Sequence, residues 1–228
     1  LGWLAVNVAD TDGIIDLDGG ALPLSPFDIA VPGDFSSAAF LLTAAVLLDG
    51  SEVEFEGVGL NPSRTGLLDL LARMGGEIQQ QVTTEDPEPC GTLVARSTAL
   101  EGVEVDEGIV PRVIDEVPLI AVAATQASGE TVLKGAGELR VKESDRIAVL
   151  AAGLRELGAA VEELPDGLVI AGPTVLREGS VDPEGDHRMA LAFAVAGLIS
   201  TGPVRIRGWE CTAISYPEFD RHLSELQA

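Results

Sequence analysis

The stretch VPLIAVAATQASG, residues 117–129, is apolar on nearly every side of the helix that it predicts. A helix that is apolar all round must be buried inside a fold. Two more stretches follow the same plan, AAFLLTAAVLLDG at 38–50 and MALAFAVAGLISTG at 189–202. Each follows polar residues that can cap a helix, and each ends at a glycine. The sequence therefore predicts three buried helices.

The segments around these helices repeat as well. After each buried helix comes a short strand of alternating polarity, and after that a polar loop and a second, amphipathic helix such as 145–157. The strands that follow the buried helices are predicted over 52–56, 131–134 and 204–207. The first two units then continue into paired strands, at 77–82 with 92–96 and at 160–164 with 168–171.

This order predicts an α/β fold of nearly three βαβαββ-like units, with buried parallel helices inside and sheets outside. The units cover about 30–100, 110–172 and 184–228, and the last stops after its second helix. Residues 1–29 differ, because they read as a strand, a DTDG turn, a strand and a Pro-rich link. The chain also starts at Leu1 rather than Met, which indicates a fragment or a processed chain.

The bulk composition excludes several classes of protein. The net charge of −23 disfavours nucleic acids and anionic membranes as partners. No apolar run approaches the ~18 to 20 residues of a membrane span. The two cysteines, Cys90 and Cys211, form neither a metal cluster nor a disulfide framework, which predicts a cytoplasmic protein without a metal site.

The strongest local signal is the run RVKESDR at 140–146, between a predicted strand and a predicted helix. Arginine offers phosphate or carboxylate a bidentate fork, lysine offers a point charge, and a helix start adds free N–H groups. Glu143, beside these cations, can act as an acid or a base. The alternative is a plain capping run in which Ser144 or Asp145 caps the helix and the charges are solvated.

Two other runs precede buried helices. Asp115 and Glu116 stand before the helix at 117–129, where a partly desolvated carboxylate can serve as a base. The alternative there is simple capping by Asp115. Asp186, His187 and Arg188 open the third buried helix, and a His-Arg pair at that place suits an anion better than it suits plain capping.

If the units share one fold, these helix starts lie at equivalent ends and face a common cleft. Such a cleft would hold the cations Arg140, Lys142, Arg146 and Arg188, which favours a polyanionic ligand. From the residues alone we predict a phosphorylated small molecule and carboxylates for proton transfer. The chain has no GxxxxGK[ST] loop, no GxGxxG after a strand, no GxSxG and no HExxH.

Six strings in the chain resemble the 5-enolpyruvylshikimate-3-phosphate synthase family in their order and approximate spacing. They are PGDFSSAAF (32–40), GLNPSRTGLLDLLARMGG (59–76), IDEVPLIAVAA (114–124), LRVKESDR (139–146), DHRMALAF (186–193) and YPEF (216–219). The resemblance covers the chain from about Gly33 onward. VKESDR together with DHRMA is highly specific, because the related enolpyruvyl transferase acting on UDP-N-acetylglucosamine lacks this pair.

The resemblance implies a fold of two similar domains, each built from three repeated units, with the active site in the cleft between them. Residues 30–228 would form one enolpyruvyl-transferase-type domain, and residues 1–29 the closing β-hairpin and link of an otherwise missing second domain. The implied activity is the shikimate-pathway transfer of a carboxyvinyl group from phosphoenolpyruvate to the 5-hydroxyl of shikimate 3-phosphate. This is the glyphosate-target step on the way to chorismate and the aromatic amino acids, and it implies no cofactor.

The resemblance also implies roles for single residues. Asp115 matches an aspartate that contacts the substrate hydroxyl and is a candidate base, and Glu143 matches a glutamate proposed to protonate the phosphoenolpyruvate methylene. Lys142 matches a lysine near the phosphates and the reacting hydroxyl. Arg146 and Arg188 match arginines that grip phosphoenolpyruvate, and His187 beside Arg188 completes the expected substrate-binding set.

The chain departs from the family pattern in three ways. Ile214 stands where some members have a lysine that touches phosphoenolpyruvate, which leaves glyphosate sensitivity open, and Glu138 stands where some have asparagine. The N-terminal half is missing, so we expect this chain alone to be inactive. Two alternatives stay open at this point, a non-catalytic anion-binding domain and an enolpyruvyl transferase with another acceptor.

Overall fold

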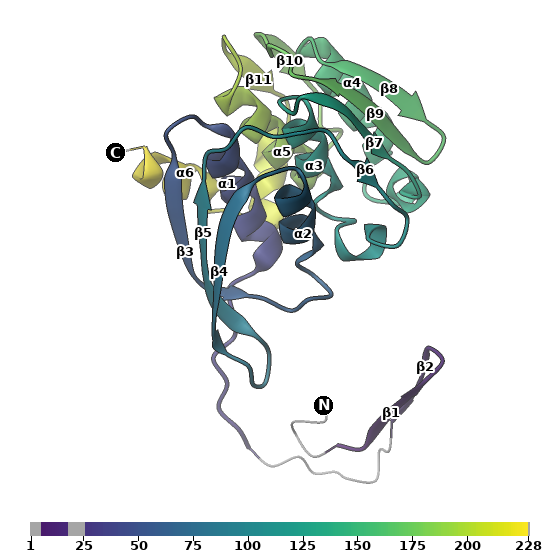
Figure 1. Ribbon diagram of the computed structural model, residues 1–228, viewed down its shortest axis with the longest axis vertical. Coiled ribbons are helices and arrows are strands. Elements are labelled where there is room, and N and C mark those ends of the chain that lie inside the picture. The colour runs from purple at the N-terminus through teal and green to yellow at the C-terminus, as the bar shows by residue number, and fades with distance from the viewer. Residues whose placement is uncertain (1–5, 18–25, 228) are drawn as a thin grey trace.

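Three buried helices form the centre of the molecule in the computed structural model, which describes residues 6–17 and 26–227 (Figure 1). The helices are α1 (Phe35–Leu47), α3 (Val117–Ala124) and α5 (His187–Leu198), and they pack against one another. All eight residues of α3 are buried. Burying apolar surface stabilises a fold by about 25 cal/mol per Å². The prediction that these three segments are core helices is therefore confirmed.

An antiparallel sheet covers α1 and α2 (Gly66–Arg73) on the outside of the first unit (Figure 1). Its strand order is β3-β5-β4. The strands are β3 (Glu52–Gly59), β4 (Glu77–Thr84) and β5 (Cys90–Arg96). In β5 every second residue is buried, which is the pattern of a strand with one face on the core.

The second unit shows the full βαβαββ order, with α3 and α4 (Arg146–Glu156) as its helices. Its four-stranded sheet has the order β6-β7-β9-β8, in which β6 and β7 are parallel and the other pairs antiparallel. The strands are β6 (Glu104–Val105), β7 (Gly129–Leu133), β8 (Ala160–Leu164) and β9 (Gly167–Gly172). The α/β fold with outer sheets is confirmed.

The third unit is shorter. Its strands β10 (Gly179–Val181) and β11 (Val204–Ile206) form a parallel pair on either side of α5 in the chain, and α6 (Phe219–Leu226) follows. No strand of the described residues pairs with the other edge of β11. The corresponding edges of β3 and β7 are occupied by β5 and β9.

The N-terminal strands β1 (Val8–Thr11) and β2 (Ile14–Leu17) form the predicted hairpin, with Asp12 and Gly13 in the turn at positive φ. Every residue of the two strands is exposed, and the hairpin lies apart from the helix core (Figure 1). The assignment of 1–29 to another domain stays a prediction, and part of that segment, 1–5 and 18–25, lies outside the described residues.

The structure corrects two predictions about the runs of candidate site residues. Asp115 does not cap α3, because Glu116 occupies the capping position and no side-chain hydrogen bond caps this helix. The run 140–146 does not follow a strand directly, since a 3-10 helix, η4 (Gly137–Val141), stands between β7 and α4. Two more 3-10 helices were also missed, η3 (Val110–Arg112) and η5 (Trp209–Ile214). Within the described ranges, each helix is too short or too polar to cross a bilayer.

Candidate active site

The N-termini of α1, α3 and α5 meet at one end of the helix core. Ser36 in the first turn of α1 donates a hydrogen bond of 2.5 Å to Glu116 at the start of α3. Arg188 in the first turn of α5 lies 3.8 Å from the same carboxylate. The three helices therefore run in the same direction, as predicted. Their free N–H groups and positive dipole ends make this end of the molecule favourable for an anion.

Arg146 is the most deeply buried cation of the cluster, with a side chain only 1% exposed. Its Nε donates to Oδ2 of Asp186 at 2.7 Å, and its Nη2 donates to Oε2 of Glu143 at 2.6 Å. Asp186 is itself fully buried and caps α5 by accepting from the backbone N–H of Arg188 at 2.9 Å. A buried guanidinium needs such partners because burial removes its hydration.

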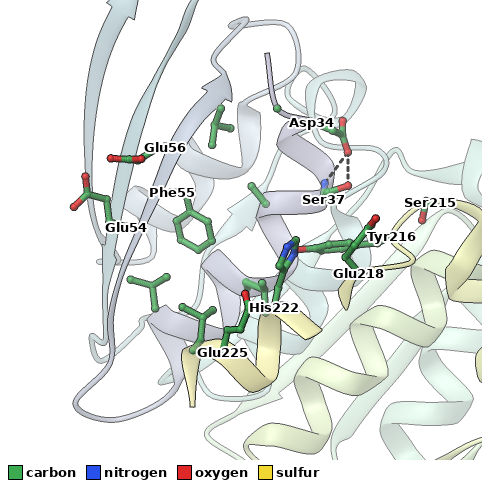
Figure 2. Close-up of a pocket in the computed structure, with 16 residues that line it drawn as sticks. Asp34, Ser37, Glu54, Phe55, Glu56, Ser215, Tyr216, Glu218, His222 and Glu225 are labelled. Atoms are coloured by element: carbon green, nitrogen blue, oxygen red, sulfur yellow. Dashed lines mark hydrogen bonds between the residues drawn. The ribbon is translucent and has the colours of Figure 1, made fainter. Parts of the chain in front are cut away.

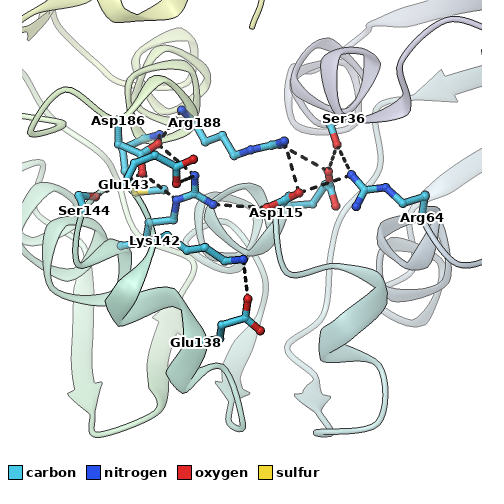
Figure 3. A network of polar contacts seen from close by, with 12 residues as sticks. Ser36, Arg64, Asp115, Glu138, Lys142, Glu143, Ser144, Asp186 and Arg188 are labelled. Atoms are coloured by element: carbon cyan, nitrogen blue, oxygen red, sulfur yellow. Dashed lines mark hydrogen bonds and ion pairs between the residues drawn. The ribbon is translucent and has the colours of Figure 1, made fainter. Parts of the chain in front are cut away.

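Asp115 stands among three arginines (Figure 3). Its carboxylate oxygens lie 3.4 Å from Arg64, 3.4 Å from Arg146 and 3.4 Å from Arg188. Burial by itself would raise the pKa of Asp115, but the three positive charges, that of Arg188 foremost, outweigh burial and hold the pKa below its usual value. Asp115 is therefore ionised at neutral pH.

Glu116 differs from its neighbour Asp115 because it lies inside the protein, 2% exposed. Burial raises the pKa of Glu116, and the hydrogen bond from Ser36 and the charge of Arg188 offset this effect only in part. Arg64 reaches the same place, since its Nη2 donates to Oγ of Ser36 at 3.2 Å. The pKa values of the two adjacent carboxyl groups are thus shifted in opposite directions.

The predicted cation Arg140 does not join this cluster. Its guanidinium pairs with Asp145 at 2.8 Å and with Glu163 on β8 at 2.9 Å. Asp145 caps α4 by accepting from the backbone N–H of Ala148 at 3.0 Å. The capping alternative is therefore correct for Asp145, but the charge of Arg140 is ion-paired rather than solvated as that alternative predicted.

Glu143 and Lys142 lie at the open side of the cluster. Glu143 accepts the 2.6 Å hydrogen bond from Arg146 although its side chain is 53% exposed, so an incoming ligand can reach it. Lys142 extends toward Asp115 in Figure 3, and its Nζ pairs with Glu138 at 2.6 Å. Lys142 is therefore ion-paired with Glu138. Glu138 is the residue that stands where some family members have asparagine.

His187 contributes no positive charge. Burial lowers the pKa of its imidazole, which keeps the ring neutral at neutral pH. In the run 186–188 the capping interpretation is confirmed for Asp186, whereas the anion site stays a prediction, with Arg188 beside the carboxylate of Asp115.

Sequence reasoning gave no role to Arg64 or Ser36, which the fold brings to Asp115 and Glu116. Arg64 and Asp115 are 51 residues apart, and Ser36 and Glu116 are 80 apart. No local pattern reveals such pairings. The signal for Arg64 was its place in the string GLNPSRTG, before the start of α2.

The arrangement suits an anion that takes the guanidinium groups of Arg64, Arg146 and Arg188 away from Asp115. None of these three contacts is shorter than 3.4 Å, so an anion with better geometry can compete for the same donors. Asp115 and Glu143 then lie beside the bound anion, where an ionised carboxylate can accept a proton and return it in a later step.

A separate hollow of about 530 Å³ lies between α1, β3 and α6 (Figure 2). Part of its lining is apolar, with Leu41, Val53 and Phe55 among the lining residues. Its other lining residues include five carboxylates and neither Arg nor Lys. This charge disfavours a phosphorylated ligand, so the arginine cluster is the better candidate for chemistry. Among the described residues, no group of His, Cys, Asp and Glu could hold a metal ion.

Comparisons with known proteins show the family to which the chain is similar. Residues 3–223 match the sequence profile of the family described as EPSP synthase (3-phosphoshikimate 1-carboxyvinyltransferase). A 3-phosphoshikimate 1-carboxyvinyltransferase of Geobacter sulfurreducens is 48% identical over 208 residues, which are 91% of this chain and 48% of that protein. One of Xanthomonas euvesicatoria is 48% identical over 221 residues, 96% of this chain and 50% of that protein.

Solved structures give the same result. The chain superposes on an EPSP synthase of Acinetobacter baumannii with a TM-score of 0.94 and 37% identity, covering 99% of this chain and 53% of that one. The enolpyruvyl transferase NikO of Streptomyces tendae shares the fold, with a TM-score of 0.77 at 20% identity. The chain spans about half the length of the curated relatives it matches.

Proposed function

The chain belongs to the EPSP synthase family, and on that premise we propose that it is one half of a carboxyvinyltransferase. The whole enzyme transfers the carboxyvinyl group of phosphoenolpyruvate to the 5-hydroxyl of shikimate 3-phosphate and releases phosphate. The observation that carries the proposal is the cluster of Arg64, Arg146 and Arg188 around Asp115, at the meeting point of the helix N-termini.

Anion binding comes first in the proposed reaction. Phosphoenolpyruvate carries a phosphate and a carboxylate, and Arg146 and Arg188 offer each a planar fork of N–H donors. Lys142 leaves Glu138 for a substrate phosphate, and neutral His187 lies beside Arg188 at the edge of the site. Holding phosphoenolpyruvate and shikimate 3-phosphate side by side converts a bimolecular step into an effectively unimolecular one.

Two steps that need proton transfer follow. The 5-hydroxyl oxygen adds to C2 of phosphoenolpyruvate as the hydroxyl proton passes to a base and C3 gains a proton, which gives a tetrahedral intermediate. Loss of a C3 proton with departure of phosphate then restores the double bond. We assign the base to Asp115 and proton exchange at C3 to Glu143, whose exposed carboxylate lies next to the guanidinium of Arg146.

The other half of the enzyme completes the site. The acceptor-binding groups are expected on the N-terminal half, so that half is the proposed partner. The isolated chain should then bind phosphoenolpyruvate weakly and turn over nothing, because the transition state needs groups from both halves. A cytoplasmic location without nucleic-acid or membrane partners belongs to the same proposal.

Phosphate release tests the proposal. Phosphoenolpyruvate and shikimate 3-phosphate are supplied to the chain alone and to the chain mixed with the N-terminal half of the Geobacter sulfurreducens relative. We expect release in the mixture only, and its loss with Asp115→Asn. Phosphoenolpyruvate binding without turnover in the mixture would instead favour an anion-binding domain, and enzyme-like turnover by the chain alone would contradict the half-enzyme proposal.

A further inference from the structure

Five polar residues form a closed ring at the meeting point of the three units. Starting at Asp115, the contacts run to Arg64 at 3.4 Å, to Ser36 at 3.2 Å, to Glu116 at 2.5 Å, to Arg188 at 3.8 Å and back to Asp115 at 3.4 Å. We call these residues the polar ring. Figure 3 shows Arg64 and Arg188 reaching into it from opposite sides.

Glu116 is the buried acid of the polar ring. The residue is 2% exposed, whereas the side chain of Asp115 is 20% exposed. A ligand that approaches from solvent therefore meets Asp115 and not Glu116. A carboxylate buried in this way costs stability unless it is paired, and Ser36 and Arg188 are the partners of Glu116.

Buried Arg146 and partly buried Arg188 have the same arrangement of contacts. Arg146 lies 2.7 Å from the fully buried carboxylate of Asp186, and Arg188 lies 3.8 Å from the buried carboxylate of Glu116. Each guanidinium also reaches the shared, more exposed carboxylate of Asp115, at 3.4 Å in both cases. One contact faces the interior and the other faces the ligand side.

We propose that Glu116, held by Ser36, is a positioning residue that fixes the guanidinium of Arg188 for the anionic substrate. The inference rests on the function proposed above and adds a residue to it. Glu116 lies near Nη1 of Arg188 and limits the rotamers of that side chain. Nη2, which lies near Asp115, can then turn to the anion without a change of rotamer. A pre-oriented donor loses less entropy on binding.

The direction in which Glu116→Gln changes phosphoenolpyruvate affinity distinguishes a positioning role from a purely electrostatic one. Glu116→Gln removes a negative charge beside an anion site, which by electrostatics alone would tighten anion binding. If Glu116 positions Arg188, the same substitution weakens binding, by about tenfold if the loss resembles that of other orienting groups. Glu225→Gln on α6 is the matched control, since it removes an exposed, ion-paired carboxylate away from the site.

The test uses the 228-residue chain. Phosphoenolpyruvate affinity is measured by isothermal titration, and the rotation of arginine guanidinium groups is measured by ¹⁵N NMR without ligand. In Glu116→Gln we expect weaker phosphoenolpyruvate binding and faster rotation of Arg188, with Arg146 unchanged as an internal control. Ser36→Ala, which leaves the charge of Glu116 in place, should shift both quantities in the same direction by less, and it decides the matter if Glu116→Gln does not fold.

Failure of the positioning role can be distinguished from failure of the proposed function. If the wild-type chain binds no phosphoenolpyruvate, the proposed function fails for this half, while the ligand-free NMR measurement still judges the positioning role. Rotation of Arg188 that does not respond to Glu116→Gln overturns the inference, and so does tighter phosphoenolpyruvate binding by that variant.

Discussion

Arg146 and Asp186 form an ion pair of 2.7 Å in which both side chains are buried, 1% and 0% exposed. The pair joins the start of α4 to the start of α5 and orients Arg146 toward Asp115. Removing one partner of such a pair leaves an uncompensated buried charge.

Asp186→Ala should therefore lower the free energy of unfolding by about 3–5 kcal/mol, to which the lost cap of α5 adds about 1 kcal/mol. Urea denaturation measures the change. Glu225→Ala, which breaks the exposed pair with Arg221, should cost less than about 1 kcal/mol and serves as the control. Equal effects of the two substitutions would show that Arg146 finds other partners.

Asp115 should give the stability of the chain a dependence on acid pH. Its pKa is lower in the folded chain than its ordinary value of 3.8, so the folded state binds this proton less tightly than the unfolded state does. The stability that Asp115 contributes is complete above pH 3.8 and is lost as pH falls through the folded pKa. In Asp115→Asn the free energy of unfolding should thus be lower than in wild type near neutral pH, and the difference should shrink in acid.

Glu116 should behave in the opposite way. Its pKa is raised above the ordinary value of 4.5, so its ionisation costs stability as pH rises from 4.5 through the folded pKa. Urea denaturation at several pH values should find Glu116→Gln no less stable than wild type at neutral pH. A gain for Asp115→Asn and a loss for Glu116→Gln at pH 7 would contradict the environments described for the two carboxylates.

Gly153 in α4 should not tolerate a methyl group. A Cβ at this position would overlap the ring of Phe193, which is completely buried in α5 and has no room to turn away. Gly153→Ala should lower the free energy of unfolding by about 1–3 kcal/mol, despite the higher helix propensity of alanine. Gly197→Ala in α5 is the control, since its nearest contact would be an ordinary 3.4 Å to Val204. Thermal denaturation compares the two variants.

Arg188→Ala should weaken phosphoenolpyruvate binding by about 10- to 100-fold, which is the worth of a charge-assisted hydrogen bond. Isothermal titration measures the affinity, and Arg221→Ala on exposed α6 removes the same charge outside the cluster. Binding that falls equally in both variants would mean that net charge rather than the cluster attracts the ligand.

The three core helices could be predicted from the sequence because a segment without a polar face, such as 117–124, has only one stable place in a fold. The roles of the charged residues could not be predicted so well. Arg146 and Arg140 stand in one run, yet the first is buried against Asp186 and the second links η4 to β8. Burial of a charge depends on partners from distant units, and no local pattern records them.

Short elements were missed for a related reason. Strands β6 and β10 have two and three residues, which is too few for an alternating pattern, and they exist because parallel neighbours pair with them. The polar ring has the same origin. Its members come from three separate units, and the fold alone brings Ser36 and Arg64 to Glu116 and Asp115.

The open edge of β11 affects how the chain behaves at high concentration. Unpaired backbone N–H and C=O groups on a strand are a template for another strand, including the same strand of a second copy. The net charge of −23 keeps two copies apart at low ionic strength. Salt shortens the range of that repulsion to about 10 Å at 0.1 M, so we expect self-association to grow with ionic strength, against the usual behaviour of contacts between opposite charges.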